Sequence, residues 1–170
     1  LVSGQVAQGG TAGPDGAGSQ GGGRIGDSSS TEGPEGGILP AYMKVGKWLH
    51  TRFRVQDLEK NLHFYKEVLG LKEISKSTSP RGSTLVFLQS EAGGEMLELC
   101  HYPASGPVKC PPDLVHLAFE VNDLDAFGRH AAARGYPWTD GPTTTSKGTR
   151  FAFVDAPEGY EVEIIEKGKK

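Results

Sequence analysis

The chain contains an internal repeat, and this repeat limits the folds that it can adopt. The segments His50–Leu58 and His116–Leu124 both begin with histidine and then share Phe at the fourth position, Val at the sixth, Asp at the eighth and Leu at the ninth. Six residues of alternating character followed by Asp predict a short strand that leads into a capped helix. A chain that repeats this pattern is expected to build two copies of one structural unit.

Both copies continue in the same order after this first strand. Helices are expected over 58–68 and 124–134, with Asp57 and Asp123 as N-caps and Gly70 and Gly135 as C-terminal caps. Further strands are predicted at 71–75, 84–89 and 95–101 in the first copy and at 137–139, 150–155 and 161–166 in the second. The predicted fold class is α+β, with two tandem βαβββ modules that pack together and form a curved mixed sheet.

Residues 1–42 differ from the rest of the chain in composition. They hold 13 of the 25 glycines and a single aromatic residue, Tyr42. Segments with so little apolar content cannot bury enough surface to offset chain entropy, so we expect a disordered tail. The abrupt change of composition at Met43 favours a vector-encoded tail over a natural flexible arm. The predicted domain covers 43–170, with one module at about 46–103 and the other at about 113–167.

The charge pattern excludes some classes of partner. The chain has 18 basic and 21 acidic residues, of which the tail holds one and four, so residues 43–170 balance at 17 and 17. The sequence contains no basic patch of the kind that would indicate a nucleic-acid partner. It also contains no apolar run that approaches the roughly 20 residues needed to cross a membrane. Two cysteines, Cys100 and Cys110, make no disulfide framework, which predicts a cytoplasmic protein.

One histidine and one glutamate recur at matched positions in the two modules. His50 precedes Glu98 by 48 residues, and His116 precedes Glu163 by 47, so each module places a His on its first strand and a Glu on its last. Two imidazoles and two carboxylates can hold a divalent metal as a Lewis acid, beside which a carboxylate moves a proton. Glu161 shares the face of Glu163, and only the spacing selects between them. We interpret the set as a four-ligand metal site.

Three basic residues are candidates for binding an anionic substrate group. Arg54 shares the strand face of His50, and a surface salt bridge is the alternative role for it. Lys147 and Arg150 lie in or beside a segment, 141–148, that we expect to be a flexible loop. They could clamp a carboxylate, and a solvated loop is the alternative.

Several stretches of the sequence resemble one enzyme family. Residues 49–58, LHTRFRVQDL, and residues 63–71, HFYKEVLGL, resemble the opening of lactoylglutathione lyase (glyoxalase I), a family of the vicinal oxygen chelate superfamily. The resemblance extends through 97–99, 115–119 and 151–166, and it covers nearly all of 46–167. It implies the glyoxalase, or vicinal oxygen chelate, fold.

The resemblance also implies a reaction and roles for individual residues. His50, Glu98, His116 and Glu163 match the family's metal ligands, with Glu163 as the main proton-abstracting base and Glu98 as the second carboxylate. Arg54 matches an arginine that contacts a glutathione carboxylate. The substrate would be the hemithioacetal of methylglyoxal and glutathione, isomerised through an enediolate to S-lactoylglutathione. This reaction belongs to methylglyoxal detoxification.

The resemblance further implies a homodimer whose sites form between subunits. It favours Ni²⁺ or Co²⁺, as in the short bacterial members, with Zn²⁺ as the other choice. Tyr102 stands where family members often carry an Asn that helps to hold glutathione.

Other readings within the superfamily are an epimerase, a thiol transferase, or a metal-free small-molecule-binding protein of the same fold. Glu98 argues against the two enzymes, because the epimerases typically have Gln at this position and the transferases use three ligands.

Overall fold

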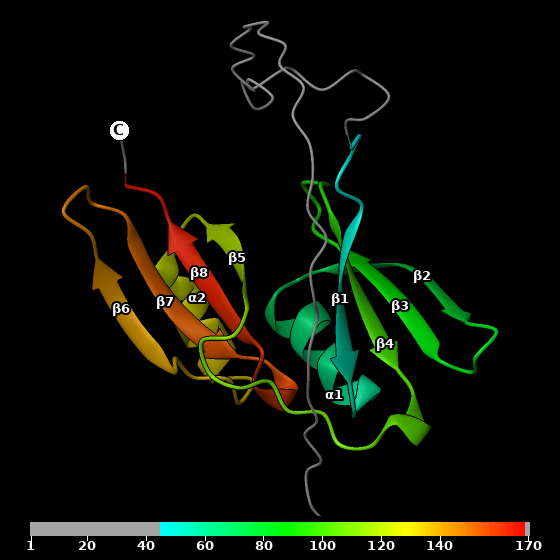
Figure 1. Cartoon of the computed structure of the whole chain (residues 1–170). Helices are drawn as coiled ribbons and strands as arrows, with labels where there is room; N and C mark the ends of the chain where they lie inside the picture. Colours follow the sequence, from blue (N-terminus) through cyan, green and yellow to red (C-terminus); the bar gives the residue numbers. More distant parts are fainter. Residues whose placement is uncertain (1–44, 169–170) are drawn as a thin grey trace, which may run out of the picture. The chain divides into compact units, whose positions relative to one another are not determined.

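The two sequence repeats form two modules with the same order of elements. The computed structural model describes residues 45–168 of the chain. The first module contains β1 (His50–Val55), α1 (Leu58–Leu62), a π-helical turn η2 (His63–Val68), β2 (Lys72–Thr78), β3 (Thr84–Gln89) and β4 (Met96–His101) (Figure 1). The second contains β5 (His116–Val121), α2 (Leu124–Ala132), β6 (Asp140–Thr144), β7 (Arg150–Asp155) and β8 (Glu161–Glu166).

Each module builds its own four-stranded mixed sheet. The strand orders are β1-β4-β3-β2 and β5-β8-β7-β6. In each sheet the first and last strands of the module pair in parallel, whereas the other neighbours are antiparallel. The predicted α+β class and the tandem βαβββ modules are confirmed. The structure differs in having two separate sheets in place of one curved sheet.

The helix caps lie where the sequence predicts them. Asp57 and Asp123 each accept a hydrogen bond from the backbone N–H three residues ahead, at 3.0 and 2.8 Å. Gly70 and Gly135 adopt φ values of 74° and 88°, the left-handed conformation that ends many helices. The helix predicted over 58–68 is present, but its second half is π-helical.

The sixth strand lies outside its predicted range. Instead of 137–139, the strand β6 occupies Asp140–Thr144, so the loop expected over 141–148 is shorter than predicted. Pro142 is tolerated in this strand because β6 is the edge strand of its sheet, where a proline need not cost a ladder hydrogen bond. Gly141, at φ 83°, lies where the pairing with β7 is irregular.

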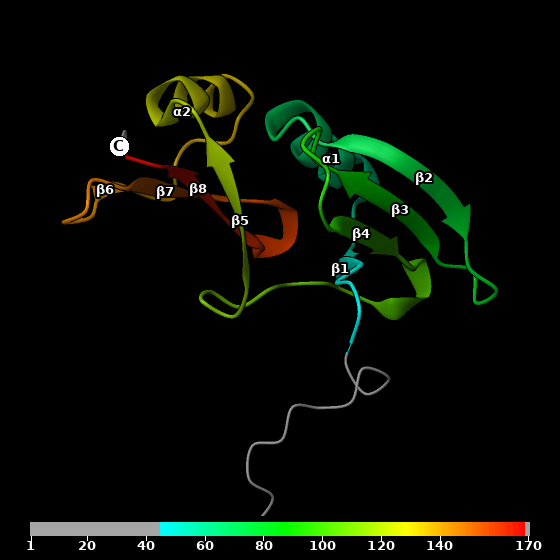
Figure 2. The ribbon, with the colours of Figure 1, turned by 90° about the horizontal axis from the view of Figure 1, so that it is seen from above.

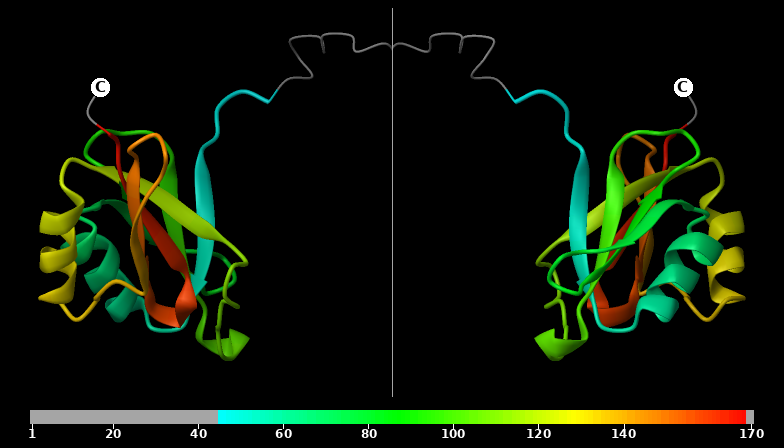
Figure 3. Two further views of the ribbon diagram at one scale, coloured as in Figure 1. Left: turned by 90° about the vertical axis from the view of Figure 1, so that its left-hand side faces the viewer. Right: turned by 90° about the vertical axis from the view of Figure 1, so that its right-hand side faces the viewer.

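The apolar core lies between the sheets and the helices. Strand residues such as Phe53, Leu99, Val154 and Ile164 are buried on the sheet faces that the helices cover. Helices α1 and α2 lie side by side on one side of the two sheets (Figures 2 and 3), and His130 of α2 bonds the carbonyl oxygens that end η2. This packing leaves the opposite face of each sheet for polar side chains.

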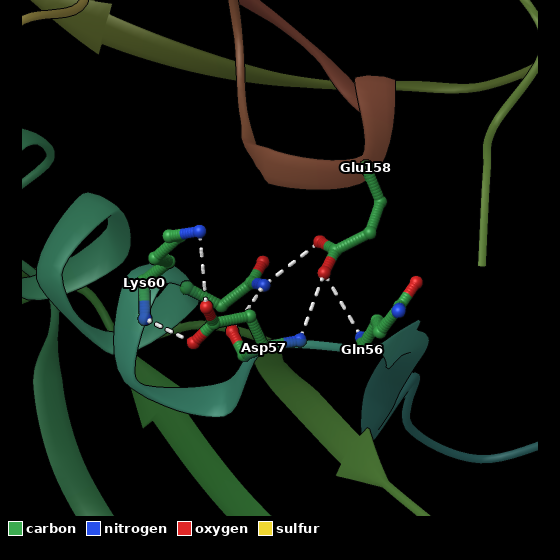
Figure 4. Close-up of polar contacts among 5 residues, drawn as sticks. Gln56, Asp57, Lys60 and Glu158 are labelled. Atoms are coloured by element: carbon green, nitrogen blue, oxygen red, sulfur yellow. Dashed lines mark hydrogen bonds and ion pairs between the residues drawn. The ribbon is translucent and has the colours of Figure 1, made fainter. Parts of the chain in front are cut away.

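The modules are joined at the turn Pro157–Gly159. The Glu158 carboxylate accepts hydrogen bonds from the backbone N–H groups of Gln56 and Asp57, at 2.9 and 3.1 Å, and from the Asn61 side chain at 2.8 Å (Figure 4). A residue of the second module therefore holds the start of the helix in the first.

Tyr160 adds a second contact between the modules. Its ring stacks on Phe53 with centroids 4.2 Å apart, and its hydroxyl donates to the carbonyl of Arg54 at 3.0 Å. Together with Glu158, this contact fixes the second module against β1.

Two predictions concern features beyond this core. Within residues 45–168, no helix is long and apolar enough to cross a membrane. The tail predicted over 1–42 lies outside the described residues, and the domain boundaries stay predictions.

Candidate metal centre

The first His–Glu pair lies where β1 runs parallel to β4. The alternation that buries Phe53 against the helices turns His50 and Glu98 to the opposite face of the sheet. The Nε2 atom of His50 lies 3.1 Å from the Oε2 atom of Glu98. Phe87 of β3 stands opposite Glu98 in the register and meets the His50 ring edge to face, with centroids 5.4 Å apart.

The second pair repeats this arrangement between β5 and β8. The Nε2 atom of His116 lies 3.5 Å from the Oε2 atom of Glu163. Phe153 of β7 stands opposite Glu163 and meets the His116 ring edge to face at 5.7 Å. The two modules therefore carry equivalent half-sites, each made of a histidine, a glutamate and a phenylalanine.

The spacing within each pair fits two ligands of one metal ion. Ligand nitrogen and oxygen atoms bond first-row divalent metals at about 2.0–2.2 Å, which at angles of about 90–110° sets them about 2.9–3.5 Å apart. The separations of 3.1 and 3.5 Å lie within this range. Each half-site can thus supply two of the expected four ligands.

One chain does not bring the two half-sites together. Among residues 45–168, no three His, Cys, Asp or Glu side chains are grouped so that they could hold a metal. The four proposed ligands therefore do not form one group within residues 45–168 of a single chain. The pairs His50–Glu98 and His116–Glu163 are each formed, but separately.

The two half-sites differ in one neighbour of the glutamate. Arg52 is the register partner of Glu98, and its Nε and Nη2 atoms lie 2.8 and 2.7 Å from Glu98 Oε1. This hydrogen bond raises the pKa of the Arg52 guanidinium. At the equivalent place opposite Glu163 stands Ala118. The Glu98 side chain is 1% exposed, whereas Glu163 is 19% exposed.

Arg54 lies beside the first half-site. With Arg52, Arg81 and Tyr102 it lines a groove of about 580 Å³ on the module-one sheet. The Nε atom of Arg54 is buried and has no hydrogen-bond partner among the described residues. The groove thus presents three guanidinium groups next to the His50–Glu98 pair, a charge pattern that suits an anionic ligand.

Lys147 and Arg150 are placed differently. Lys147 is exposed in the turn between β6 and β7. Arg150 lies on the helix-covered face of β7, where it bonds Asp125 at 2.7 Å and Glu166 at 3.2 Å. The bond to Arg150 lowers the pKa of the Asp125 carboxyl. The structure therefore ties Arg150 to the start of α2 and turns it away from the face that carries His116.

Sequence reasoning missed three residues of these half-sites. Phe87 and Phe153 precede the two glutamates by 11 and 10 residues, a match as regular as the one that selects the glutamates. The strands that carry these phenylalanines and glutamates were predicted, so this signal was available. The alternation of β1 puts Arg52 on the face of His50, but its ion pair with Glu98 depends on strand register, which the sequence does not give.

These features define a class of protein: two βαβββ modules, each with a His–Glu pair on the sheet face away from its helix. The model of the Glyoxalase/Bleomycin resistance protein/Dioxygenase superfamily matches residues 47–164. The chain belongs to this superfamily.

Individual relatives are similar over most of the same region. A probable lactoylglutathione lyase of Synechocystis sp. is 32% identical over 126 residues, which cover 72% of this chain and 96% of that protein. The lactoylglutathione lyase of Neisseria meningitidis is 35% identical over 123 residues, covering 70% and 89%. A solved structure of the trypanothione-dependent glyoxalase I of Leishmania major matches with a TM-score of 0.60 and 30% identity, covering 72% of this chain and 87% of that one.

These similarities confirm two predictions made from the sequence. The resemblance to lactoylglutathione lyase is confirmed, and so is the assignment as a lyase of the glyoxalase I type.

Proposed function

We propose that this protein is a metal-dependent lyase that isomerises the hemithioacetal of methylglyoxal and glutathione to S-lactoylglutathione. The observation that carries the proposal is the pair of equivalent half-sites, His50–Glu98 and His116–Glu163, with ligand spacings of 3.1 and 3.5 Å. The lactoylglutathione lyases among the relatives support the choice of substrate.

A complete site needs a second copy of the chain. Apolar residues directly before each histidine are exposed: Trp48 by 68%, Leu49 by 60%, Leu114 by 67% and Val115 by 37%. Exposed apolar side chains beside each proposed ligand are the kind of surface that a protein interface would cover. In a two-fold symmetric dimer the first half-site of each chain would meet the second half-site of its partner, which gives two identical sites.

The four ligands would hold the metal with imidazole nitrogens and carboxylate oxygens, a donor set that suits Ni²⁺, Co²⁺ or Zn²⁺. When bound, the metal would act as a Lewis acid for the two neighbouring oxygens of the substrate. We favour Ni²⁺ or Co²⁺ by analogy with the short bacterial members. Cys100 and Cys110 are free thiols, which supports a reducing compartment such as the cytoplasm.

Proton transfer falls to Glu163 in this proposal. Its carboxylate would take the proton from the substrate carbon that bears the sulfur and return a proton to the adjacent carbon. Glu163 faces no guanidinium in its register, whereas Glu98 is paired with Arg52 and buried. Arg54 would bind a carboxylate of the thiol, because it lines the groove beside the first pair.

The test is a direct assay of the chain loaded with nickel. Methylglyoxal and glutathione should give growing thioester absorbance, and Glu163→Gln should remove it while the protein remains folded by circular dichroism. Tyr102 and the three arginines of the groove make other acidic thiols worth assaying in parallel. If the protein demonstrably binds metal but forms no thioester with any cellular thiol, the result would point instead to another enzyme of the superfamily. Failure to bind any metal would favour a small-molecule-binding protein.

A further inference from the structure

The two half-sites are equivalent except at the residue that faces the glutamate. Both strand registers are the same, so the second residue after each histidine stands opposite the metal-site carboxylate. In the first module this residue is Arg52, and in the second it is Ala118. The two modules can therefore be compared directly: the proposed ligand Glu98 has a cationic neighbour in its strand register, and the proposed ligand Glu163 has none.

The contact divides the Glu98 carboxylate between two partners. Both Arg52 nitrogens approach the same oxygen, Oε1, at 2.8 and 2.7 Å, while Oε2 faces His50 at 3.1 Å. Charge-assisted hydrogen bonds of this length are strong and directional. Arg52 therefore leaves Oε2 as the oxygen of Glu98 that is available to a metal.

The same contact offsets a buried negative charge. Glu98 is 1% exposed, and an unpaired carboxylate at that depth would be costly. A divalent ion bound between His50 and Oε2 would be separated from the Arg52 guanidinium by only the Glu98 carboxylate group. Two cations at such a short separation repel each other. Arg52 thus stabilises the metal-free half-site and opposes the arrival of a second cation.

We infer that Arg52 is a positioning residue that restricts Glu98 to one metal-binding oxygen and weakens metal binding at the first half-site. This inference rests on the proposed function, since it takes Glu98 as a metal ligand. The expected consequence is a readily exchangeable metal, whose affinity is limited by Arg52 and not by the ligands themselves.

The test compares metal affinities of the full chain by competition with a fluorescent chelator, using nickel and then zinc. Loss of a hydrogen-bonding partner of a metal ligand typically lowers metal affinity by about 10–100-fold. Because Arg52 is itself a cation that competes with the metal for the Glu98 carboxylate, we expect Arg52→Met to change affinity in the opposite direction and to raise it by at least about tenfold. Thermal unfolding of the metal-free protein should begin at lower temperature in this variant, because Glu98 loses its partner. The inference thus predicts that the metal affinity rises while the unfolding temperature of the metal-free protein falls. An arginine with a purely structural role would lower the unfolding temperature without raising the metal affinity.

Two further variants keep the test decisive. Arg81→Met removes an exposed guanidinium from the groove beside the first half-site without touching Glu98. It should change metal affinity by less than about threefold, since an exposed charge without direct contact is largely screened. Ala118→Arg places a guanidinium opposite Glu163 and should lower the metal affinity. This variant tests the inference independently if Arg52→Met fails to fold.

The outcomes separate this inference from the proposed function. Unchanged or weaker binding by Arg52→Met, with metal bound by the wild-type chain, would overturn the role of Arg52 and leave the proposed function standing. Binding by neither the wild type nor any variant would overturn both. Binding by Arg52→Met alone would support the inference.

Discussion

The contact between Glu158 and the start of α1 gives a quantitative prediction about stability. Glu158→Ala removes an acceptor for two backbone N–H groups and for the Asn61 amide, at 2.8–3.1 Å. A hydrogen bond to a charged group contributes about 1.5–3 kcal/mol when it is sheltered from water. Because the carboxylate is only half-buried and water can replace part of the set, we expect a loss of about 2–4 kcal/mol in the free energy of unfolding.

Urea denaturation followed by circular dichroism measures this loss. With a dependence on urea of about 2 kcal/mol per molar, typical of a small domain, the midpoint should fall by about 1–2 M. The matched control is Glu91→Ala, since Glu91 is exposed and forms an ion pair with the exposed Lys72; surface pairs of this kind contribute little, so this change should leave the urea midpoint almost unchanged. Equal midpoints for the two variants would refute the view that Glu158 fixes one module to the other.

Three further predictions concern single positions. Gly128→Ala should destabilise α2 despite the better helix propensity of alanine, because the added Cβ would lie 2.5 Å from Nε1 of Trp138; calorimetry should show a lower melting temperature. Asp123→Ala should cost about 1 kcal/mol in urea denaturation, through loss of the cap. The bond to the Lys60 N–H lowers the pKa of Asp57, so its contribution is present above the unfolded pKa and lost as the pH falls through the folded pKa. Asp57→Ala should therefore flatten the acid limb of a stability–pH profile.

The repeat in the sequence predicted most of the fold, because each local signal agreed with the tertiary structure. Asp57 and Gly70 bracket the first helix in sequence and in space, and the strand pattern that begins at His50 meets no competing signal. The strand β6 was misplaced, because Pro142 indicates a loop to any local rule, whereas its place at the sheet edge depends on contacts with β7.

The His–Glu pairs of the candidate site were predictable from the sequence, whereas their role as metal ligands stays a prediction. Spacing alone paired His50 with Glu98 and His116 with Glu163, and the two registers place each pair within ligand distance. The alternation along a strand fixes which face each side chain occupies. It does not fix which residues of two parallel strands stand opposite each other, and the ion pair between Arg52 and Glu98 depends on that register. Whether the half-sites meet within one chain or between two chains depends likewise on how the folded surfaces fit together, which local sequence patterns do not give.

The central claim, that two copies of the chain share each metal site, is tested most directly by complementation. His50→Ala damages the first half-site and Glu163→Gln the second, so each variant alone should lack thioester-forming activity in the presence of nickel. Unfolding and refolding the two together should produce mixed dimers in which one of the two sites has all four ligands. We predict that activity and tightly bound nickel return in the mixture, at about half a wild-type dimer's level in each mixed dimer. A mixture that forms dimers but remains as inactive as its components would contradict the claim.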